Sequence, residues 1–564
     1  MPAKDYKSLV PFSAPKPETE NANGRHRVSN GMYRVHKILS PEEVAAGKTT
    51  HWAELEIRGR NISPELWKLQ HLTALFLCNN HLQRIPPQIS QLTNLQILDL
   101  SNNKLRSLPA ELGDMISLQH LYLNNNVLRV LPFELGRLFR LQTLGLHGNP
   151  LSPEISQLYR EPNGTQKLLQ FFLDHLSVNV PSPPERLWVP LHRVDRDKPL
   201  ATFTVMCYNV LCEKYASSSL YAYCPSWALN WDYRKKLILQ EIKQYEADVI
   251  TLQEVETEQY RSFFKPELET LGYQGIFSPK SRAKTMAEDD RKFVDGCAIF
   301  WKADKYEFHK EHLIEFTQLA IAKADGSEHM LNRVMTRDNI GLVAVLRIRE
   351  GIYGNAHPSQ QDSLAGTPFV VCTAHIHWDP EFCDVKLVQC MMLVQELNSI
   401  LEETAEQHRM SSDRIPVLVC GDLNSLPESG VYDYLTAGRI SADHSDFKDF
   451  RGQTCLQKLS SSTSPHVYSH RLKLESAYDV GMLPFTNYTC DFKGVIDYVF
   501  ASPVLYRLGV LGGPDVSWFQ EHKIVGCPYP NIPSDHIPLL VQYVIIPPSV
   551  QHQRTFSAPH LFNR

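Results

Sequence analysis

Leucines in the first third of the chain recur at a constant spacing. The pattern LxxLxLxxNxL begins at Leu72, Leu95, Leu118 and Leu141, a step of 23 residues each time. A constant step of this length, with leucines grouped around a short strand, predicts a solenoid of leucine-rich repeats. One copy cannot bury its apolar face alone, so the copies must stack on one another.

Each copy carries an asparagine just after its strand, where an amide can satisfy backbone groups as the chain turns. An imperfect copy at residues 52–57 predicts an N-terminal cap, and helical leucine spacing over residues 165–176 predicts a C-terminal cap. We therefore predict a docking domain over residues 51–176, with a rigid spacer as the alternative. The asparagines are Asn80, Asn103, Asn126 and Asn149.

A different pattern governs residues 201–546. Short runs of β-branched and aromatic residues stop at, or lead into, a polar residue, and residues 231–245 and 385–401 have helical spacing. This predicts an α/β (α+β) sandwich with helices outside its sheets, and polar residues gathered on one rim, where sites of such folds form. These residues are Asn209, Glu254, His375, Asp422, Asn424, Asp497, Asp535 and His536.

Proline-containing segments flank the two predicted domains. Residues 1–30 and 547–564 are predicted to be flexible tails, because they cannot bury enough apolar surface to offset the entropy of ordering. Residues 177–200 contain several prolines and predict a semi-rigid linker. Residues 351–367 predict a surface insertion that stays away from the chemistry.

Composition and charge narrow the class of protein. The chain has 43% hydrophobic and 21% charged residues, which is typical of globular proteins. Its net charge of -5 provides no global attraction for a polyanion, so a nucleic-acid substrate would need a local groove and metal ions. The 12 scattered cysteines favour a reduced intracellular compartment, and no apolar run is long enough to span a bilayer.

The residues on the predicted rim have the chemistry of a phosphodiester hydrolase. Magnesium prefers oxygen ligands, so Glu254 and Asp422 are natural ligands, and one ion or two could activate water and polarise a phosphate. Asp422 and Asn424 lie two apart and share a strand face. His375 and His377 leave zinc as an alternative, but no third ligand follows at suitable spacing.

The ordered set of motifs resembles the exonuclease-endonuclease-phosphatase superfamily. The motifs are C-Y-N-V-L, L-Q-E-V, G-D-L-N-S, G-V-I-D-Y and S-D-H, which contain Asn209, Glu254, Asp422, Asp497 and His536. The resemblance implies the four-layer, deoxyribonuclease-like sandwich of that superfamily. The segments W-D-Y-R-K-K, A-H-I-H-W-D-P and N-Y-T-C-D-F-K-G, joined to the repeats, resemble the carbon catabolite repressor protein four type of deadenylase, a catalytic subunit of the Not complex.

This resemblance implies a role for each matching residue. Glu254 and Asp422 would bind two magnesium ions, with Glu254 also touching the scissile phosphate and Asp422 acting as general acid/base. Asn209 and Asn424 would hold metal or phosphate oxygens. His536, oriented by Asp497, would stabilise charge on the phosphoryl group, and His375 would contact the phosphate.

Selection of adenine needs a stacking surface and groups that read a base edge. Phe492 can supply a ring face, Pro380 an apolar wall and Asn487 a polar contact, although Phe492 could instead be a core aromatic. Asp290 falls where the family has a carboxylate that contacts substrate. A solvated surface loop is the alternative for Asp290.

The resemblance implies a magnesium-dependent 3′-to-5′ exoribonuclease that shortens poly(A) tails of mRNA and releases 5′-AMP. Its repeats would bind the ribonuclease-D-like deadenylase subunit of the Not complex and, through it, the scaffold. The implied compartment is the cytoplasm, with the nucleus as a further one. Two alternatives stay open: another phosphoesterase of the same fold, and a non-catalytic adaptor.

Overall fold

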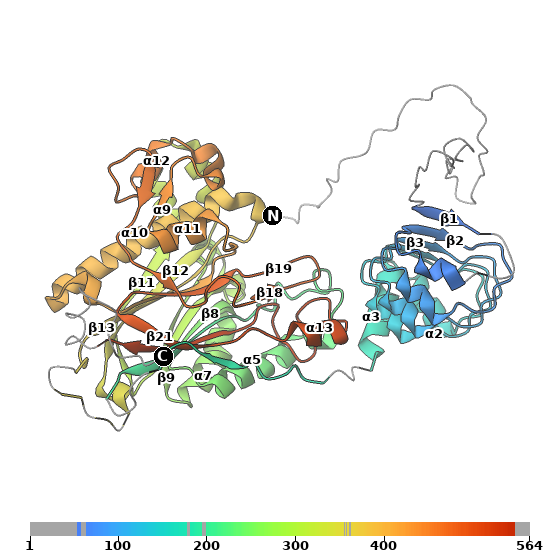
Figure 1. Ribbon diagram of the computed structural model, residues 1–564, viewed down its shortest axis with the longest axis horizontal. Coiled ribbons are helices and arrows are strands. Elements are labelled where there is room, and N and C mark those ends of the chain that lie inside the picture. The colour runs from blue at the N-terminus through green and yellow to red at the C-terminus, as the bar shows by residue number, and fades with distance from the viewer. Residues whose placement is uncertain are drawn as a thin grey trace.

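The computed structural model describes residues 53–57, 62, 64–177, 181–193, 199–354, 356, 358–359 and 363–546. Both predicted tails and Trp52 of the predicted N-terminal cap lie outside the described residues. Figure 1 shows the repeats as one body and the larger sandwich as another.

The repeats form a five-stranded parallel sheet in sequence order. Its strands are β1 (Glu54–Glu56), β2 (Ala74–Phe76), β3 (Ile97–Asp99), β4 (His120–Tyr122) and β5 (Thr143–Gly145). The return segments are short 3-10 helices, η1 (Pro64–Lys68), η2 (Pro87–Gln91), η3 (Ala110–Asp114) and η4 (Phe133–Arg137). The predicted C-terminal cap is present as α2 (Pro153–Arg160) and α3 (Gly164–His175), and the leucines of all copies share one core.

The consensus asparagines act as the sequence predicts. The Asn103 amide nitrogen donates hydrogen bonds to the carbonyl oxygens of Leu77 and Leu100, both at 2.9 Å. Its side-chain oxygen accepts a hydrogen bond from the Leu82 backbone nitrogen at 3.1 Å. One side chain therefore links neighbouring copies through buried backbone groups, each carbonyl oxygen being shared with the asparagine of the adjacent copy.

The second domain contains two large mixed sheets. The seven-stranded sheet has the order β6 (Trp188–Pro190), β21 (Leu505–Leu511), β22 (Leu539–Ile545), β7 (Thr202–Asn209), β8 (Val249–Glu256), β10 (Asp295–Lys302) and β9 (Tyr273–Pro279). The six-stranded sheet has the order β11 (Tyr306–Glu315), β12 (Ile340–Ile348), β13 (Pro368–His375), β14 (Val417–Asp422), β20 (Asp497–Ala501) and β17 (Glu475–Ser476).

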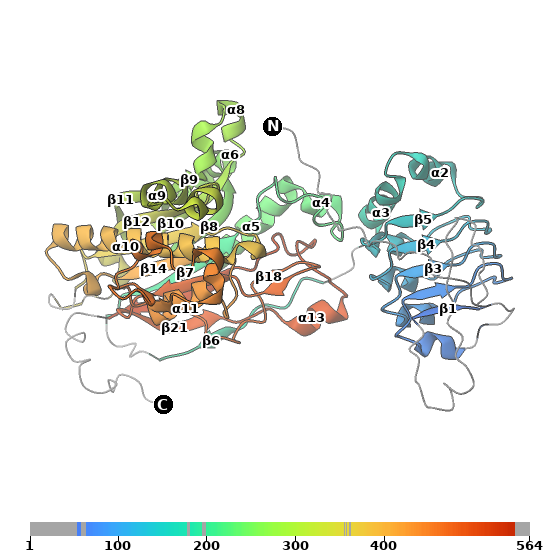
Figure 2. The same cartoon turned by 90° about the horizontal axis from the view of Figure 1, so that it is seen from above.

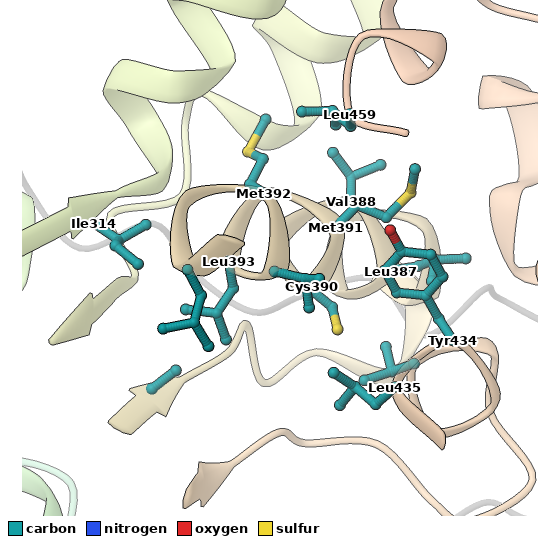
Figure 3. Packing of buried hydrophobic residues seen from close by; sticks show 14 of the residues in the cluster. Ile314, Leu387, Val388, Cys390, Met391, Met392, Leu393, Tyr434, Leu435 and Leu459 are labelled. Carbon is teal, nitrogen blue, oxygen red and sulfur yellow. The ribbon is translucent and has the colours of Figure 1, made fainter. Parts of the chain in front are cut away.

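The two sheets face each other and carry helices on their outer sides, which confirms the four-layer sandwich (Figure 2). Phe203 of β7 and Phe369 of β13 belong to the core between the sheets, with ring centroids 5.3 Å apart. α5 (Trp231–Tyr245) packs against the seven-stranded sheet, and α10 (Cys383–His408) against the six-stranded one. Figure 3 shows Leu387 to Leu393 of α10 within its cluster.

The remaining elements lie around this frame. The helices are α4 (Ser226–Leu229), α6 (Thr257–Gln259), α7 (Lys265–Glu269), α8 (Glu288–Arg291), α9 (Phe316–Lys323), α11 (Gly430–Ala437), α12 (Thr454–Gln457) and α13 (Val516–Glu521). Two small hairpins pair β15 (Arg439–Ser441) with β16 (Val467–Ser469), and β18 (Asn487–Tyr488) with β19 (Lys493–Gly494). Among the described residues, no helix combines the length and apolar character needed to cross a bilayer.

Three details differ from the sequence prediction. The sheet begins before residue 201, because β6 lies inside the predicted linker and pairs with β21. Asp497 is the first residue of β20, although we expected an apolar run to lead into it. The predicted insertion at 351–367 contains the end of a 3-10 helix (Glu350–Tyr353), and residues 355, 357 and 360–362 of it lie outside the described part.

The helical side of the repeats, opposite the strands, contacts the sandwich. Lys523 forms an ion pair with Asp114 at 2.6 Å, and Arg140 forms one with Asp491 at 2.7 Å. The Ser226 hydroxyl donates to Asp174 of α3 at 2.6 Å. The strand face of the repeats is therefore not the face that the sandwich covers.

Candidate active site

The strand pairing explains why distant polar residues meet on one rim. β7 and β8 run parallel and pair Asn209 with Gln253, next to Glu254. In the other sheet, Asp422 pairs with His375 on one side and with Asp497 on the other. Because β20 is antiparallel to β14, its first residue lies beside the last residue of β14. Asp497 reaches the rim for this reason.

Gly421 permits the close approach of β13 and β14 just before this rim. A Cβ atom at position 421 would lie 2.1 Å from the carbonyl oxygen of Ala374. No other residue type fits without moving the strand that carries Asp422. Steric crowding therefore explains why the G-D-L-N-S motif begins with glycine.

One carboxylate oxygen is the centre of the site. Oδ2 of Asp422 accepts a hydrogen bond from Asn209 Nδ2 at 3.0 Å. It also lies 3.6 Å from His375 Nε2 and 3.6 Å from His536 Nε2. Asn209 Nδ2 is shared with Glu254 Oε1, at 3.2 Å, and so joins the two carboxylates.

His536 and Asp497 form a buried pair at this centre. His536 Nδ1 lies 2.8 Å from Asp497 Oδ2, which fixes the ring and leaves Nε2 directed at Asp422. Burial alone would lower the pKa of His536, but Asp497, Asp422 and Asp535 together hold it well above its usual value. These three carboxylates therefore favour the protonated, imidazolium form of the ring.

Burial raises the pKa of both carboxyl groups that Asn209 joins. For Asp422 the neighbouring charge of Asp497 adds to this effect, and for Glu254 the charge of Asp295 does so. Glu254 also adopts a left-handed backbone conformation, with φ of +57°, which a glutamate rarely adopts. Such strain concentrates at functional sites.

A second row of residues holds the Ser-Asp-His segment in place. Oδ2 of Asp535 accepts hydrogen bonds from the Tyr221 hydroxyl at 2.8 Å and from Asn487 Nδ2 at 3.2 Å. Asn487 also forms a β-bridge with His536, and the Ser534 hydroxyl donates to the Asn209 carbonyl oxygen at 2.7 Å. The rim is thus one connected network.

The site fits a divalent cation. The carboxylates of Asp422 and Asp497 come together beside His536 in the described chain, with one polar atom of each side chain within 4.8 Å of the others. The carboxylates, and not the His536 ring that pairs with Asp497, are the groups that would hold the ion. Oδ1 of Asp497 and Oδ1 of Asp535 are buried with no hydrogen-bond partner. The rim therefore holds several carboxylates with little positive charge beside them, and the pKa values of Glu254 and Asp422 are raised. Carboxylate oxygens are the ligands that Mg²⁺ prefers.

The other predicted residues have different positions. Asn424 is half-buried and its Nδ2 donates to the Ile376 carbonyl oxygen at 3.0 Å. Pro380 is exposed at the start of a 3-10 helix (Pro380–Phe382). Phe492 is 39% exposed at the tip of the β18–β19 hairpin, so it is not a core aromatic. Asp290 is exposed on α8, and within the described chain no side-chain hydrogen bond or ion pair joins it to the rim.

The zinc alternative finds no geometric support. His375 faces Asp422, but the His377 ring packs edge-on against Phe382, with centroids 5.3 Å apart. Burial and the nearby Arg337 lower the pKa of His377 to about 4. The two histidines do not share a ligand group with a third residue in the part of the chain that the structure describes.

Sequence reasoning missed two buried cations near the site. Lys280 forms an ion pair with the buried Asp295 at 2.7 Å, and Arg282 approaches the same carboxylate at 2.7 Å. Arg234 of α5 is completely buried and donates to the carbonyl oxygens of Leu211 and Pro533, which holds the loop after β7 against the segment before Ser534. The sequence did contain a sign of this burial, because Arg234 lies in the predicted helix at residues 231–245 among its apolar positions.

Comparisons with known proteins agree with this architecture. The profile of the Endonuclease/Exonuclease/phosphatase family matches residues 206–536, and that of the leucine-rich repeat matches residues 70–128. The chain is 53% identical to the CCR4-NOT transcription complex subunit 6-like protein of Danio rerio, over 91% of this chain and 94% of that protein. It is 40% identical to the CCR4-Not complex 3′-5′-exoribonuclease subunit Ccr4 of Schizosaccharomyces pombe, over 88% and 74% of the two chains.

One solved structure shares the fold of the second domain. It is the crystal structure of ANGEL2, a 2′,3′-cyclic phosphatase, in complex with adenosine-2′,3′-vanadate. Its sequence is 26% identical to this chain, with a TM-score of 0.50, and the match covers 64% of this chain and 99% of ANGEL2. The match extends over the sandwich and not over the whole protein.

Proposed function

The chain belongs to the Endonuclease/Exonuclease/phosphatase family and, within it, to the Ccr4-type subunits of the CCR4-Not complex, and on this premise we propose that it is a magnesium-dependent 3′-to-5′ exoribonuclease that shortens poly(A) tails. The observation that carries the proposal is the convergence of Asn209, His375 and His536 on one oxygen of Asp422. Glu254 and Asp497 connect to the same oxygen through Asn209 and His536.

Glu254 and Asp422 are the proposed magnesium ligands. Bound magnesium would offset the phosphate charge and make water more acidic. Asp422 then orients the attacking water and takes its proton, while the His536 imidazolium donates a hydrogen bond to the phosphoryl oxygens. Asp497 holds that imidazolium in place through Nδ1. His375 and Asn209, which also lie beside Oδ2 of Asp422, position the scissile phosphate.

The proposed reaction is a hydrolysis. The water oxygen bonds to phosphorus, and the bond between phosphorus and the 3′ oxygen of the preceding nucleotide breaks. That 3′ oxygen gains a proton, so the products are 5′-AMP and an RNA that is one nucleotide shorter. Phe492 and Pro380 would enclose the terminal adenine, and Asn487 would contact its polar edge.

For the repeats we propose docking to the ribonuclease-D-like deadenylase subunit of the complex. Support comes from the names of the relatives, which are complex subunits, and from the strand face of the repeats. His120 and Tyr122 of β4 are half-buried on this face, with stacked rings whose centroids lie 6.4 Å apart. Tyrosine is enriched in protein interfaces, so this face suits a protein partner.

The test is digestion of a 5′-labelled RNA that ends in oligo(A), with magnesium or with EDTA, beside tails of U, C and deoxyadenosine. We expect a magnesium-dependent ladder from the 3′ end that stalls where the oligo(A) ends, and 5′-AMP as the product by chromatography. Internal cleavage, or equal rates on all tails, would contradict the proposal.

A second substrate distinguishes this proposal from the alternative that the protein is another phosphoesterase of the same fold. The fold of ANGEL2 makes an RNA ending in a 2′,3′-cyclic phosphate a direct comparison. If the protein removed only that phosphate and left the oligo(A) intact, a phosphatase would be the better conclusion. A folded protein inactive on both RNAs would favour the non-catalytic adaptor.

A further inference from the structure

A cleft of about 800 Å³ lies between the repeats and the sandwich. One wall consists of η3, η4 and the end of α3, and the other of the β18–β19 hairpin and α13. In Figure 1 this hairpin points from the sandwich towards the repeats. The ion pairs Lys523–Asp114 and Arg140–Asp491 cross from one wall to the other, so the cleft has a defined shape.

The cleft is positively charged in a protein that is negative overall. Four cationic side chains and only two carboxylates line it, which leaves an excess of two positive charges. Asp114 is shared by Arg137 and Lys523, and the ammonium of the exposed Lys493 lies over the rings of Phe485 and Tyr488, 4.9 Å from each centroid. The cations are Arg137, Arg140, Lys493 and Lys523, and the carboxylates are Asp114 and Asp491.

Aromatic rings line the cleft together with these charges. Phe139 and Tyr488 are half-buried, so their rings are partly open to the cleft. The exposed Phe492, to which we assign the terminal adenine, borders the same space. A groove of cations with interleaved rings is the surface that single-stranded nucleic acid recognises, because phosphates meet the cations and bases stack on the rings. The rings are Phe139, Tyr223, Tyr488, Phe492, Phe519 and Tyr529.

The hairpin connects this cleft to the catalytic rim. Its first residue, Asn487, bridges to His536 and donates to Asp535, while its tip carries Asp491 and Phe492 into the cleft. Asp491 lies four positions after Asn487, a reach of at most roughly 13 Å. At a stacking distance of about 3.4 Å, this reach corresponds to about four nucleotides.

Resting on the exoribonuclease function proposed above, we propose that this cleft binds the single-stranded RNA upstream of the 3′-terminal nucleotides while the terminus occupies the rim. The repeat domain would then contribute directly to substrate binding, through Arg137 and Phe139, besides docking a partner. An acidic peptide is the competing occupant. RNA is favoured because the hairpin that lines the cleft also contacts the phosphodiesterase site, and because cations and aromatic rings line the cleft together.

The test compares full-length wild-type protein with the double variant Arg137→Gln/Lys493→Gln. This change removes the excess positive charge, while both ion pairs that cross the cleft remain. The substrates are the trinucleotide ApApA and a 20-residue oligo(A), and the readout is the ratio of their kcat/KM values. We expect the ratio of long to short substrate to fall roughly tenfold in the variant, as expected for the loss of two phosphate contacts.

A salt series provides the second readout. The slope of log(kcat/KM) against log salt concentration on the 20-residue substrate should become shallower by about 1.4, at ~0.7 for each lost contact with a single strand. The matched control, Lys265→Gln/Arg471→Gln, makes the same charge change at exposed ion pairs that do not line the cleft. It should retain both the wild-type ratio and the wild-type slope.

The possible outcomes separate this inference from the function on which it rests. An unchanged ratio and slope in the cleft variant, with a normal melting curve, would overturn the RNA cleft and leave an acidic peptide as its occupant. A wild-type protein that hydrolyses neither ApApA nor the 20-residue oligo(A) in magnesium would instead refute the proposed function. Equal losses on both substrates would also overturn the inference, because they would place the effect at the catalytic rim.

Discussion

The repeats and the catalytic rim use the same residue type in opposite ways. Asn126 donates to the Leu100 and Leu123 carbonyl oxygens and accepts from the Leu105 backbone nitrogen, all at 3.0 Å. Every contact of that side chain is with a neutral backbone group. Asn209 instead donates to two carboxylates, Glu254 and Asp422. In the repeats the amide completes a stable structure, and at the rim it holds together charges that repel each other.

The backbone shows the same difference. Asn79, Asn102 and Asn125 have positive φ angles at equivalent turns of the repeats, a conformation that asparagine tolerates. Glu254 adopts a similar φ at the rim, where the residue type has no such tolerance. Stability therefore sets the sequence of the repeats, whereas the rim gives up stability to hold its carboxylates in a defined place.

The largest expected effect is at the rim. Asp422→Asn removes the charge on which Asn209, His375 and His536 converge, so kcat/KM on oligo(A) should fall about a thousandfold, or ~4 kcal/mol of transition-state stabilisation. Because burial disfavours the Asp422 charge, the melting temperature should not fall. Rates and thermal unfolding of the purified variant test both parts.

Asp443→Asn is the matched control, since Asp443 is exposed on a loop outside the rim. It should leave both rate and melting temperature unchanged. If Asp422→Asn unfolded the protein, the rim would be a structural centre like the repeats, and the contrast between them would be lost.

The reverse behaviour is expected in the repeats. Asn126→Ala leaves the buried Leu105 backbone nitrogen without an acceptor and takes one of two donors from the Leu100 and Leu123 carbonyl oxygens. This should lower the free energy of unfolding of the repeats by about 2 kcal/mol. Hydrolysis of ApApA should stay at the wild-type rate. Denaturant unfolding followed by circular dichroism measures the loss, with the exposed Gln91→Ala as a control that should change stability by less than ~0.5 kcal/mol.

Sequence patterns predicted the parts of the fold that depend on local periodicity. The 23-residue step located the repeats, and helical spacing gave α5 with the bounds that the structure has. The sequence did not predict β6, because a three-residue edge strand that contains Pro190 has the composition of a linker. Proline is tolerated there since an edge strand leaves one row of backbone groups unpaired.

The sequence predicted the residues of the candidate site, but not all of the contacts between them and their surroundings. Strand ends and motifs identified Asn209, Asp422 and His536, and the structure places these three side chains together. The Lys280–Asp295 pair left no trace in the sequence, because burial of a charge depends on tertiary packing and not on spacing. Asp290 shows the converse: its motif position suggested substrate contact, and the structure places it exposed on α8.

A smaller effect is expected on the strand face of the repeats. Tyr122→Glu places a charge where the proposed partner would bury the ring, so binding of the purified ribonuclease-D-like subunit should weaken by about thirtyfold, or ~2 kcal/mol. Activity on ApApA should not change. Tyr122→Phe keeps the ring and should bind normally in the same pull-down or calorimetry. Equal binding by both variants would move the docking surface elsewhere.

The smallest expected effect separates the two regions by ligand binding alone. At a free magnesium concentration ten times its Kd, binding should stabilise the sandwich by ~1.4 kcal/mol, which raises its melting temperature by roughly 3 °C relative to EDTA. The transition of the repeats should stay in place, because their polar groups already have partners. Glu254→Gln should abolish the shift in the sandwich, whereas Gln91→Ala should keep it. A shift that survived Glu254→Gln would mean that magnesium binds away from the rim, and the buried carboxylates would then need another source of positive charge.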